Sequence, residues 1–370
     1  MRIAIDVRKI NDFGIGTYLR NLIRHLPGLD SDNEYHLLCY ERDEELLRSL
    51  SSNFRLSFVK AKNYSLAEHF SIPAKLKRIR ADLYHAPHYV LPYLTPCRSV
   101  VTIHDVIHLL FPQYLPSRFA IHYARHMIGR ALERAELVMT VSKASKRDLL
   151  GFFDVEESKI RVIPNGIDPA MTRELAPEEL DRVRQRFQLQ GRNALFVGNI
   201  KPHKNVERLI AAFAKLREDP QFSDLTLIVV GDEISKYPSL RRAVARHAVR
   251  PNVRFFGFVP ELTLVALYRA ADVFVFPSLY EGFGLPPLEA MANGTPVVTS
   301  KISSLPEVVG EAALTVDPYN IDEISEAMKS ILTDSALRAR LIHDGRVRAQ
   351  QFVWEESVSQ IHATYMAALR

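Results

Sequence analysis

A chain of 370 residues is long enough for about two domains, each with its own hydrophobic core. Its 47% of hydrophobic and 25% of charged residues are typical of a soluble globular protein, and no apolar run approaches the roughly 18 residues of a membrane span. The net charge of +5 is compatible with phosphates or anionic lipid, but no basic stretch is interleaved with aromatic residues, so no nucleic-acid partner is expected.

The N-terminal residues and the cysteines predict a cytoplasmic location. Asp6, Arg8 and Lys9 interrupt the first residues, so the apolar region of a signal peptide is missing there. Cys39 and Cys97 form no metal-binding spacing and fit a reducing compartment.

Short β-branched runs alternate with helical patterns, which predicts an α/β fold with parallel sheets wrapped by helices. In the first half the predicted strands are residues 2–7, 35–40, 55–59, 83–85, 99–104, 137–141 and 161–163. In the second half they are residues 194–198, 225–231, 253–256, 273–276, 296–299 and 313–316. A turn sequence at residues 164–169, with an Asn-Gly pair and two prolines, separates the halves. Because such sheets bind ligands at the carboxyl ends of their strands, a cleft formed by both halves is expected.

Two glycines follow the first strand. Gly14 and Gly16, with Thr17 at the predicted helix start, would let the backbone approach a phosphate or a sugar. A dinucleotide-binding fingerprint needs another small residue where Leu19 stands, which argues against an NAD-type oxidoreductase.

Other polar segments of the first half can be explained without a ligand. Asp30-Ser31-Asp32 resembles a D-x-D metal motif, but it follows Pro-Gly-Leu rather than an apolar strand and is predicted to be a surface turn. The sequence therefore requires no metal and no other cofactor. The basic helices expected at residues 65–80 and 117–134 are compatible with contact to anionic lipid or a phosphorylated acceptor, although a solvated helix face is the commoner explanation for the first.

A lysine marks the start of the second half. Lys204 lies between the strand at 194–198 and a helix expected at 206–216. Because the helix dipole opposes a cation at its start, Lys204 is easier to explain if an anion lies between them, and we predict that it contacts a diphosphate. The alternative is an exposed lysine without a ligand.

The most informative stretch is residues 273–296. An apolar strand is followed by the loop Glu281-Gly282-Phe283-Gly284, and a helix is predicted to open at Pro286-Pro287 with Glu289 in its first turn. The start of the helix is an anion site, and the glycines allow a ligand to approach closely. A carboxylate would repel a phosphate, so both glutamates are predicted to accept hydrogen bonds from hydroxyl groups. An anionic middle with hydroxylated ends describes a sugar nucleotide; the alternative is a solvated Glu281 and a Glu289 that only favours the helix dipole.

The run from Glu281 to Glu289, with the following Gly294-Thr295-Pro296-Val297-Val298, resembles the E-x7-E signature of retaining family 4 glycosyltransferases of the GT-B fold. The resemblance extends from Met1 to the C-terminus. It implies two Rossmann-like domains facing each other across a cleft: an acceptor-side domain at 1–165 and a nucleotide-sugar-binding domain at 166–352. It also implies that a last helix, at 353–370, returns to the first domain.

The resemblance also implies roles for individual residues. A histidine at the position of His104, at the end of a predicted strand, contacts the transferred sugar in this family, although a structural histidine is the alternative. Glu281, His104 and Lys204 are therefore the expected catalytic residues. Many relatives carry an arginine where this chain has Asn199, which leaves one phosphate charge unassigned. The donor-binding residues are expected to be Gly14, Gly16, Asn199, Lys204, Gly257, Phe258, Gly282, Phe283, Gly284, Leu285 and Glu289.

The expected reaction moves a hexose from a nucleoside diphosphate to a hydroxyl of a glycan or lipid-linked acceptor in surface polysaccharide synthesis. The residues offer no clear nucleophile for a double displacement. The resemblance instead implies that the acceptor attacks the anomeric carbon from the same face that the diphosphate leaves. By similarity to bacterial mannosyltransferases, the first expected donor is GDP-mannose, followed by UDP- or dTDP-hexoses. The expected location is the cytoplasm or the inner membrane surface. A glycoside hydrolase, a sugar-nucleotide epimerase and a non-catalytic sugar-nucleotide-binding protein remain alternatives.

Overall fold

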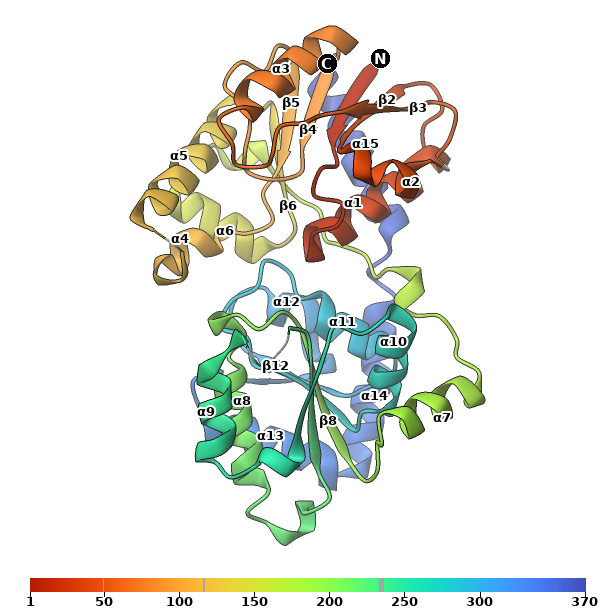
Figure 1. Ribbon diagram of the computed structural model, residues 1–370, viewed down its shortest axis with the longest axis vertical. Coiled ribbons are helices and arrows are strands. Elements are labelled where there is room, and N and C mark those ends of the chain that lie inside the picture. Colours follow the sequence, from red (N-terminus) through yellow and green to blue (C-terminus); the bar gives the residue numbers. More distant parts are fainter. Residues whose placement is uncertain (49, 116, 233–235) are drawn as a thin grey trace. The chain divides into compact units, whose positions relative to one another are not determined.

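The computed structural model describes residues 1–48, 50–115, 117–232 and 236–370 (Figure 1). The chain forms two compact units: Met1–Gly166 together with Val353–Arg370, called unit 1 here, and Ile167–Phe352, called unit 2. Each unit contains one parallel sheet with helices on both faces.

Unit 1 is built on a seven-stranded sheet with the order β3-β2-β1-β4-β5-β6-β7. Its strands are β1 (Arg2–Asp6), β2 (Glu34–Cys39), β3 (Phe54–Phe58), β4 (Leu83–Ala86), β5 (Arg98–Thr102), β6 (Leu137–Thr140) and β7 (Ile160–Val162). All neighbouring strands run parallel, and each corresponds to one of the predicted strands. The chain order reverses between β1 and β4, which is where ligands bind in sheets of this kind.

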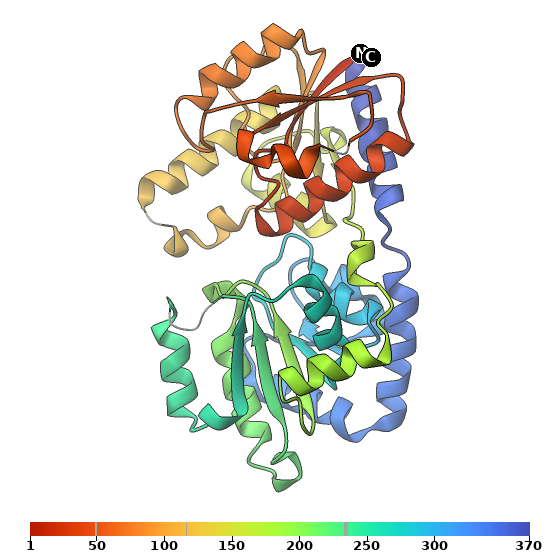
Figure 2. The ribbon, with the colours of Figure 1, turned by 45° about the vertical axis from the view of Figure 1, so that its right-hand side comes forward.

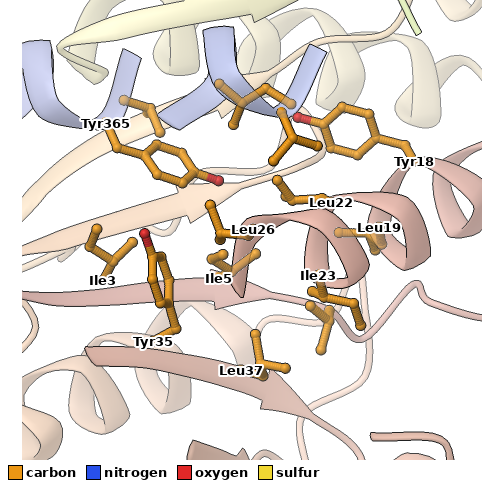
Figure 3. Packing of buried hydrophobic residues seen from close by; sticks show 14 of the residues in the cluster. Ile3, Ile5, Tyr18, Leu19, Leu22, Ile23, Leu26, Tyr35, Leu37 and Tyr365 are labelled. Atoms are coloured by element: carbon orange, nitrogen blue, oxygen red, sulfur yellow. The ribbon is translucent and has the colours of Figure 1, made fainter. Parts of the chain in front are cut away.

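Successive residues of these strands face opposite cores, as expected of a sheet covered on both sides. Ile3 and Ile5 belong to one core and Ala4 to the other. Figure 3 shows the first core, to which Tyr18 and Leu22 of the N-terminal helix and Ile5 of β1 all belong. The helices of unit 1 are α1 (Phe13–His25), α2 (Glu44–Leu47), α3 (Glu68–Ile79), α4 (Ile107–Leu110), α5 (Arg118–Arg134), α6 (Lys143–Phe152) and α15 (Trp354–Leu369).

The last helix, α15, packs in unit 1 against α1 and strands β4 to β6. Arg98 donates a hydrogen bond to the carbonyl of Ala368 (2.8 Å), far along the chain. Gly166 also belongs to this unit, one residue beyond the predicted boundary. It packs so closely against the start of α15 that a Cβ there would lie 2.3 Å from the backbone nitrogen of Trp354. Asp30, from the apparent metal motif, instead accepts hydrogen bonds from Tyr35 (2.5 Å) and His362 of α15 (2.9 Å).

Unit 2 is built on a six-stranded sheet with the order β10-β9-β8-β11-β12-β13. Its strands are β8 (Asn193–Val197), β9 (Thr226–Val230), β10 (Val253–Gly257), β11 (Val273–Phe276), β12 (Val297–Ser300) and β13 (Leu314–Val316), again all parallel and all near predicted strands. Its helices are α7 (Pro177–Arg186), α8 (Val206–Leu216), α9 (Pro238–Arg246), α10 (Glu261–Ala270), α11 (Leu285–Ala292), α12 (Leu305–Val309), α13 (Ile321–Thr333) and α14 (Ser335–Ala349). Helix α8 packs with α9 and α13, and α10 packs with α7 and α11, so that helices cover both faces of the sheet (Figure 2).

Within the described residues, no helix combines the length and apolar character needed to cross a lipid bilayer.

Candidate active site

The predicted donor-site residues of unit 2 come from loops at the point where its strand order reverses. Strands β8 and β11 are neighbours in the middle of the sheet, although β9, β10 and the helices α8, α9 and α10 lie between them in the chain. Because the two strands are parallel, the loops that follow them meet at the same edge of the sheet. Lys204 comes from the loop after β8 and Glu281 from the loop after β11. This edge is the expected ligand position in an open α/β sheet.

Lys204 and Glu281 form an ion pair. The Nζ of Lys204 lies 2.6 Å from Oε1 and 2.9 Å from Oε2 of Glu281, and 5.2 Å from the centroid of the Phe276 ring. Each side chain is only 12% exposed. Lys204 is therefore not an exposed lysine, and Glu281 is not a solvated glutamate, which were the alternatives that the sequence left open. The two residues predicted to share one site are in direct contact.

Two serines after β12 fix the loop that carries Glu281. The backbone N–H of Glu281 donates to the Oγ of Ser303 (3.0 Å), and that hydroxyl donates back to the carbonyl of Glu281 (2.7 Å). The Oγ of Ser304 has one proton, which the carbonyls of Glu281 (2.9 Å) and Phe283 (2.6 Å) share as acceptors. These bonds satisfy the backbone of an irregular loop and hold the carboxylate in place. No local sequence pattern marks either serine as part of a site.

The Lys204 loop is tied to the same edge of the sheet. The carbonyl of His203 accepts hydrogen bonds from the N–H of Leu279 (2.7 Å) and the Oγ of Ser278 (3.1 Å). Asn205, which has a left-handed φ of 62°, donates from its side-chain amide to the carbonyls of Pro277 (2.9 Å) and Pro318 (2.7 Å). The two loops thus form one hydrogen-bonded assembly, which positions Lys204 and Glu281 before any ligand arrives.

Helix α11 begins one residue earlier than predicted, at Leu285, after Gly284 with φ +117°. Glu289 is therefore the fifth residue of the helix and lies outside its first turn, which corrects the prediction. Pro286 and Pro287 occupy the second and third positions and have no N–H, so the helix start offers fewer donors to an anion than an ordinary one. Gly284 is required here, because a Cβ would lie 2.7 Å from the side chain of Leu305 in addition to the unfavourable φ.

Glu289 accepts a hydrogen bond from the hydroxyl of Tyr268 on α10 (2.9 Å). Desolvation by the surrounding protein raises the pKa of Glu289 to about 7, against the effect of this hydrogen bond and with help from the charges of Asp168 and Glu261. At pH values between the ordinary pKa of a glutamate and about 7, Glu289 keeps a proton in the folded protein that it has lost in the unfolded chain. The folded state therefore loses stability as the pH rises through this range. Hydroxyl groups that donate hydrogen bonds to this carboxyl group favour its ionised form.

We expect the affinity for a nucleoside diphosphate to depend on the ionisation of Glu289. If the ribose hydroxyls donate to the carboxylate, affinity rises with pH, by up to about tenfold between pH 6 and 8 for a group that titrates near 7. Isothermal titration calorimetry with GDP across this range measures the slope. The Glu289→Gln variant, which cannot titrate, should show a flatter profile; the same slope in both proteins would exclude this role.

Two further predicted donor contacts lie at the end of β10. Gly257 has a left-handed φ of +62°, and its carbonyl accepts a hydrogen bond from the N–H of Gly231 (3.0 Å). Phe258 is 81% exposed, so its ring is accessible for stacking on a base. Asn199 follows β8, and its carbonyl accepts a hydrogen bond from the N–H of Lys201 (3.0 Å).

His104 belongs to unit 1, where β5 ends at Thr102, so that His104 lies in the following loop rather than closing the strand as predicted. Its Nε2 donates to the carbonyl of Pro87 (3.1 Å), and the Tyr18 ring packs edge-on against it (centroids 5.0 Å apart). Burial lowers the pKa of His104, against the opposing effect of Asp105, so the imidazole is neutral near pH 7. A neutral ring that donates from Nε2 carries a lone pair on Nδ1 and can accept a hydrogen bond there.

Gly14 and Gly16 are not in a loop, which corrects the prediction. They lie in the first turn of α1, which begins at Phe13. Gly16 is buried, and a Cβ there would lie 2.5 Å from the carbonyl oxygen of Ile10, so packing alone requires this glycine. At Gly14 a Cβ would meet nothing within 4 Å, and its predicted donor contact stays a prediction.

The comparisons with known families agree with this geometry. A family model described as Glycosyltransferase Family 4 matches residues 14–171, and one described as Glycosyl transferases group 1 matches residues 177–348. The chain is 34% identical over 300 residues to O-antigen chain mannosyltransferase B of Escherichia coli, which covers 78% of this chain and 75% of that protein. It is 28% identical over 262 residues to the serotype-specific mannosyltransferase WbdA of Escherichia coli, covering 70% of this chain but only 32% of WbdA.

A solved structure shares the fold across the whole chain. The Anabaena Alr3699/HepE protein in complex with UDP-glucose matches with a TM-score of 0.79 over 99% of this chain and 100% of that one, at 21% sequence identity. At this identity the match establishes the fold alone. The two family models, the relative of 34% identity and the two parallel-sheet units lead to one conclusion: the chain is a glycosyltransferase and belongs to family 4 of the GT-B fold.

Proposed function

We propose that this glycosyltransferase moves mannose from GDP-mannose, with retention of configuration, to a hydroxyl of a glycan or lipid-linked saccharide in surface polysaccharide synthesis. The similarity to O-antigen chain mannosyltransferase B supports the sugar and the process. The contact between Lys204 and Glu281 at the reversal point of the unit 2 sheet is the observation that carries the donor site.

In this proposal the ion pair is exchanged for contacts with the donor. Lys204 pairs with the diphosphate, which gains a third negative charge as its bond to the sugar breaks. Glu281, released from Lys204, accepts hydrogen bonds from hydroxyls of the hexose, and Glu289 accepts them from the ribose. His104 accepts one from the transferred sugar. The acceptor oxygen forms a bond to the anomeric carbon as the bond to the diphosphate breaks, and the acceptor proton passes to the departing diphosphate oxygen.

The state of Glu281 supports attack without a covalent sugar intermediate. A double displacement needs a carboxylate that is free to attack the anomeric carbon. Both oxygens of Glu281 lie within 3 Å of the Lys204 Nζ, which suits a binding group better than a nucleophile. Membership of a glycosyltransferase family argues against the glycoside hydrolase and epimerase alternatives.

A donor panel tests the proposal. The protein is incubated with GDP-mannose, UDP-glucose, UDP-galactose or dTDP-glucose, with and without methyl α-mannoside as acceptor, and nucleoside diphosphate release is measured. We expect GDP release from GDP-mannose that increases with the acceptor. Release of UDP or dTDP instead would overturn the choice of donor, and no release from any donor would overturn the proposed activity.

We also propose peripheral contact with anionic lipid through α3 and α5. Phe119 is 87% exposed on α5, which also carries the exposed Arg125, and Phe70 is exposed on α3, which also carries the exposed Lys77. Exposed aromatic side chains with nearby cations suit the surface of an anionic bilayer. We expect cosedimentation with phosphatidylglycerol vesicles but not phosphatidylcholine vesicles, weakened in Phe119→Ser. Failure of the wild-type protein to bind either vesicle would contradict this contact.

A further inference from the structure

Unit 1 has a hollow at the point where its own strand order reverses. Asp6 ends β1 and Ala86 ends β4, and both line the hollow together with Arg8, Asn63, Tyr64 and His88. Strands β1 and β4 are neighbours in the sheet. The hollow therefore occupies the position in unit 1 at which open α/β sheets bind ligands.

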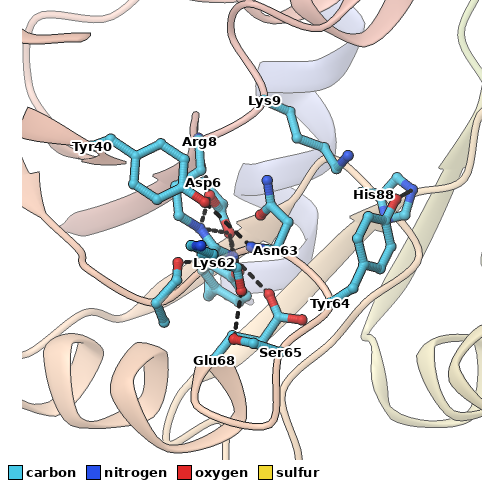
Figure 4. Close-up of polar contacts among 12 residues, drawn as sticks. Asp6, Arg8, Lys9, Tyr40, Lys62, Asn63, Tyr64, Ser65, Glu68 and His88 are labelled. Atoms are coloured by element: carbon cyan, nitrogen blue, oxygen red, sulfur yellow. Dashed lines mark hydrogen bonds and ion pairs between the residues drawn. The ribbon is translucent and has the colours of Figure 1, made fainter. Parts of the chain in front are cut away.

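The floor of the hollow is a buried ion network (Figure 4). The guanidinium of Arg8 donates to both oxygens of Asp6 (2.9 and 2.6 Å for the shortest contacts), to Oε2 of Glu68 (3.1 Å) and to the carbonyl of Ala61 (3.0 Å). Tyr84 donates to Asp6 (3.1 Å). Two carboxylates thus share one guanidinium, so the floor repels an anion and does not provide a phosphate site.

Glu68 has one unused acceptor at this floor. The residue is 2% exposed, and its Oε1 has no partner with hydrogen-bond geometry among the described residues. Burial raises the pKa of Glu68, and the charge of Arg8, the hydrogen bond from Arg8 and the backbone N–H of Tyr64 act in the opposite direction. A buried polar atom without a partner is costly, and in native proteins it is usually satisfied by water or a ligand. Glu68 also lines the hollow, so the missing partner can come from there.

The rim suits a sugar. The hydroxyl of Tyr64 pairs with Nε2 of His88 (2.9 Å), and Lys9 lies 4.8 Å above the Tyr64 ring while its Nζ contacts Asp12 (2.9 Å). Aromatic faces pack against the C–H face of a sugar ring, and the amide of Asn63 at the rim can donate or accept a hydrogen bond. Because Lys9 is already neutralised by Asp12, the rim adds no free positive charge for an anion.

The size of the hollow limits how much of a ligand enters. About 300 Å³ is empty out to open solvent, but only about 20 Å³ has room for the centre of a water-sized group. A single water or hydroxyl therefore reaches the floor, while the rest of a ligand remains at the rim.

We propose that this hollow is an acceptor subsite, in which one hydroxyl of a saccharide displaces a water and donates a hydrogen bond to Oε1 of Glu68 while its ring packs against Tyr64. The inference rests on the proposed saccharide acceptor and names where unit 1 holds it. Pro87, which lines the hollow, also accepts the hydrogen bond from His104, so the subsite adjoins the residue expected to contact the transferred sugar.

Steady-state kinetics of single variants test the subsite. In Glu68→Gln, the amide oxygen can replace the contact to Arg8, which leaves an NH₂ group facing the hollow where an acceptor stood. We expect KM for methyl α-mannoside to rise about tenfold or more, and KM for GDP-mannose to stay unchanged. Tyr64→Ala should raise the acceptor KM several-fold, also without affecting the donor. The control is Leu66→Ala, whose side chain is 82% exposed and does not line the hollow.

The two Michaelis constants separate a role in acceptor binding from a general effect on the enzyme. An unchanged acceptor KM in both variants, or an equal rise in the KM for the donor, overturns the subsite. If Glu68→Gln does not fold, Tyr64→Ala against Leu66→Ala gives the answer. If the wild-type protein does not use GDP-mannose, the proposed function fails separately, and saturation-transfer NMR with methyl α-mannoside tests the subsite directly. Signals in the wild-type protein that are lost in Tyr64→Ala support it, and their absence from the wild-type protein, or their persistence in the variant, contradicts it.

Discussion

Replacing Glu281 with alanine is expected to reduce the rate of mannosyl transfer about a hundredfold while leaving GDP affinity unchanged or slightly stronger. A charge-assisted contact to the sugar is worth roughly 1.5–3 kcal/mol, or about ten- to a hundredfold in rate. The same change frees Lys204 from its 2.6 Å ion pair, so the lysine becomes more available to a diphosphate. Transfer and nucleotide binding should therefore respond in different directions.

Rapid-quench kinetics and calorimetry with GDP measure these two quantities. Glu326→Ala removes an exposed glutamate of α13 in the same unit and provides a control that should change neither. Equal losses of transfer and of GDP affinity in Glu281→Ala would contradict a role in holding the sugar.

Replacing Lys204 with methionine is expected to weaken GDP binding by about a hundredfold. The variant loses the contact to the diphosphate, worth roughly 1.5–3 kcal/mol. It also leaves Glu281, only 12% exposed, as an unpaired carboxylate beside the ligand, where it repels the phosphates. Both effects lower affinity for any nucleoside diphosphate, so UDP and GDP should be affected alike.

A double variant separates the two effects. Lys204→Met with Glu281→Gln removes the unpaired charge, so GDP affinity should recover part of what the single lysine variant lost. Lys201→Met, at an exposed lysine three residues earlier, is the matched control. No recovery in the double variant would mean that repulsion by Glu281 contributes nothing, and an unchanged affinity in Lys204→Met would remove the lysine from the diphosphate site.

The strands could be predicted from the sequence because they are buried on both faces. Residues 273–276 are apolar without interruption, and the strand β11 has these bounds. The start of α1 could not be predicted in the same way. Glycine disfavours a helix, yet Gly14 and Gly16 are helical because Gly16 allows α1 to pack against the carbonyl of Ile10. This tertiary contact decides the local structure.

The site was predictable as a set of residue types but not as a set of contacts. Lys204 and Glu281 were each predicted from local chemistry, but 77 residues separate them, and only the parallel pairing of β8 and β11 brings them together. Ser303 and Ser304 could have been noticed as two hydroxyls directly after a buried strand, yet nothing local indicates that they bind the loop of Glu281. Glu68 was overlooked because the helix that contains it reads as a polar, basic segment, whereas the residue is buried against Arg8.

The product of the reaction with GDP-mannose tests the central claim most directly. In the donor the mannose is α-linked to the diphosphate, so proton NMR of the product formed on methyl α-mannoside should show a new α-anomeric signal, absent in Glu281→Ala at the same enzyme concentration. A β-linked product, or transfer by Glu281→Ala at the wild-type rate, would contradict the account.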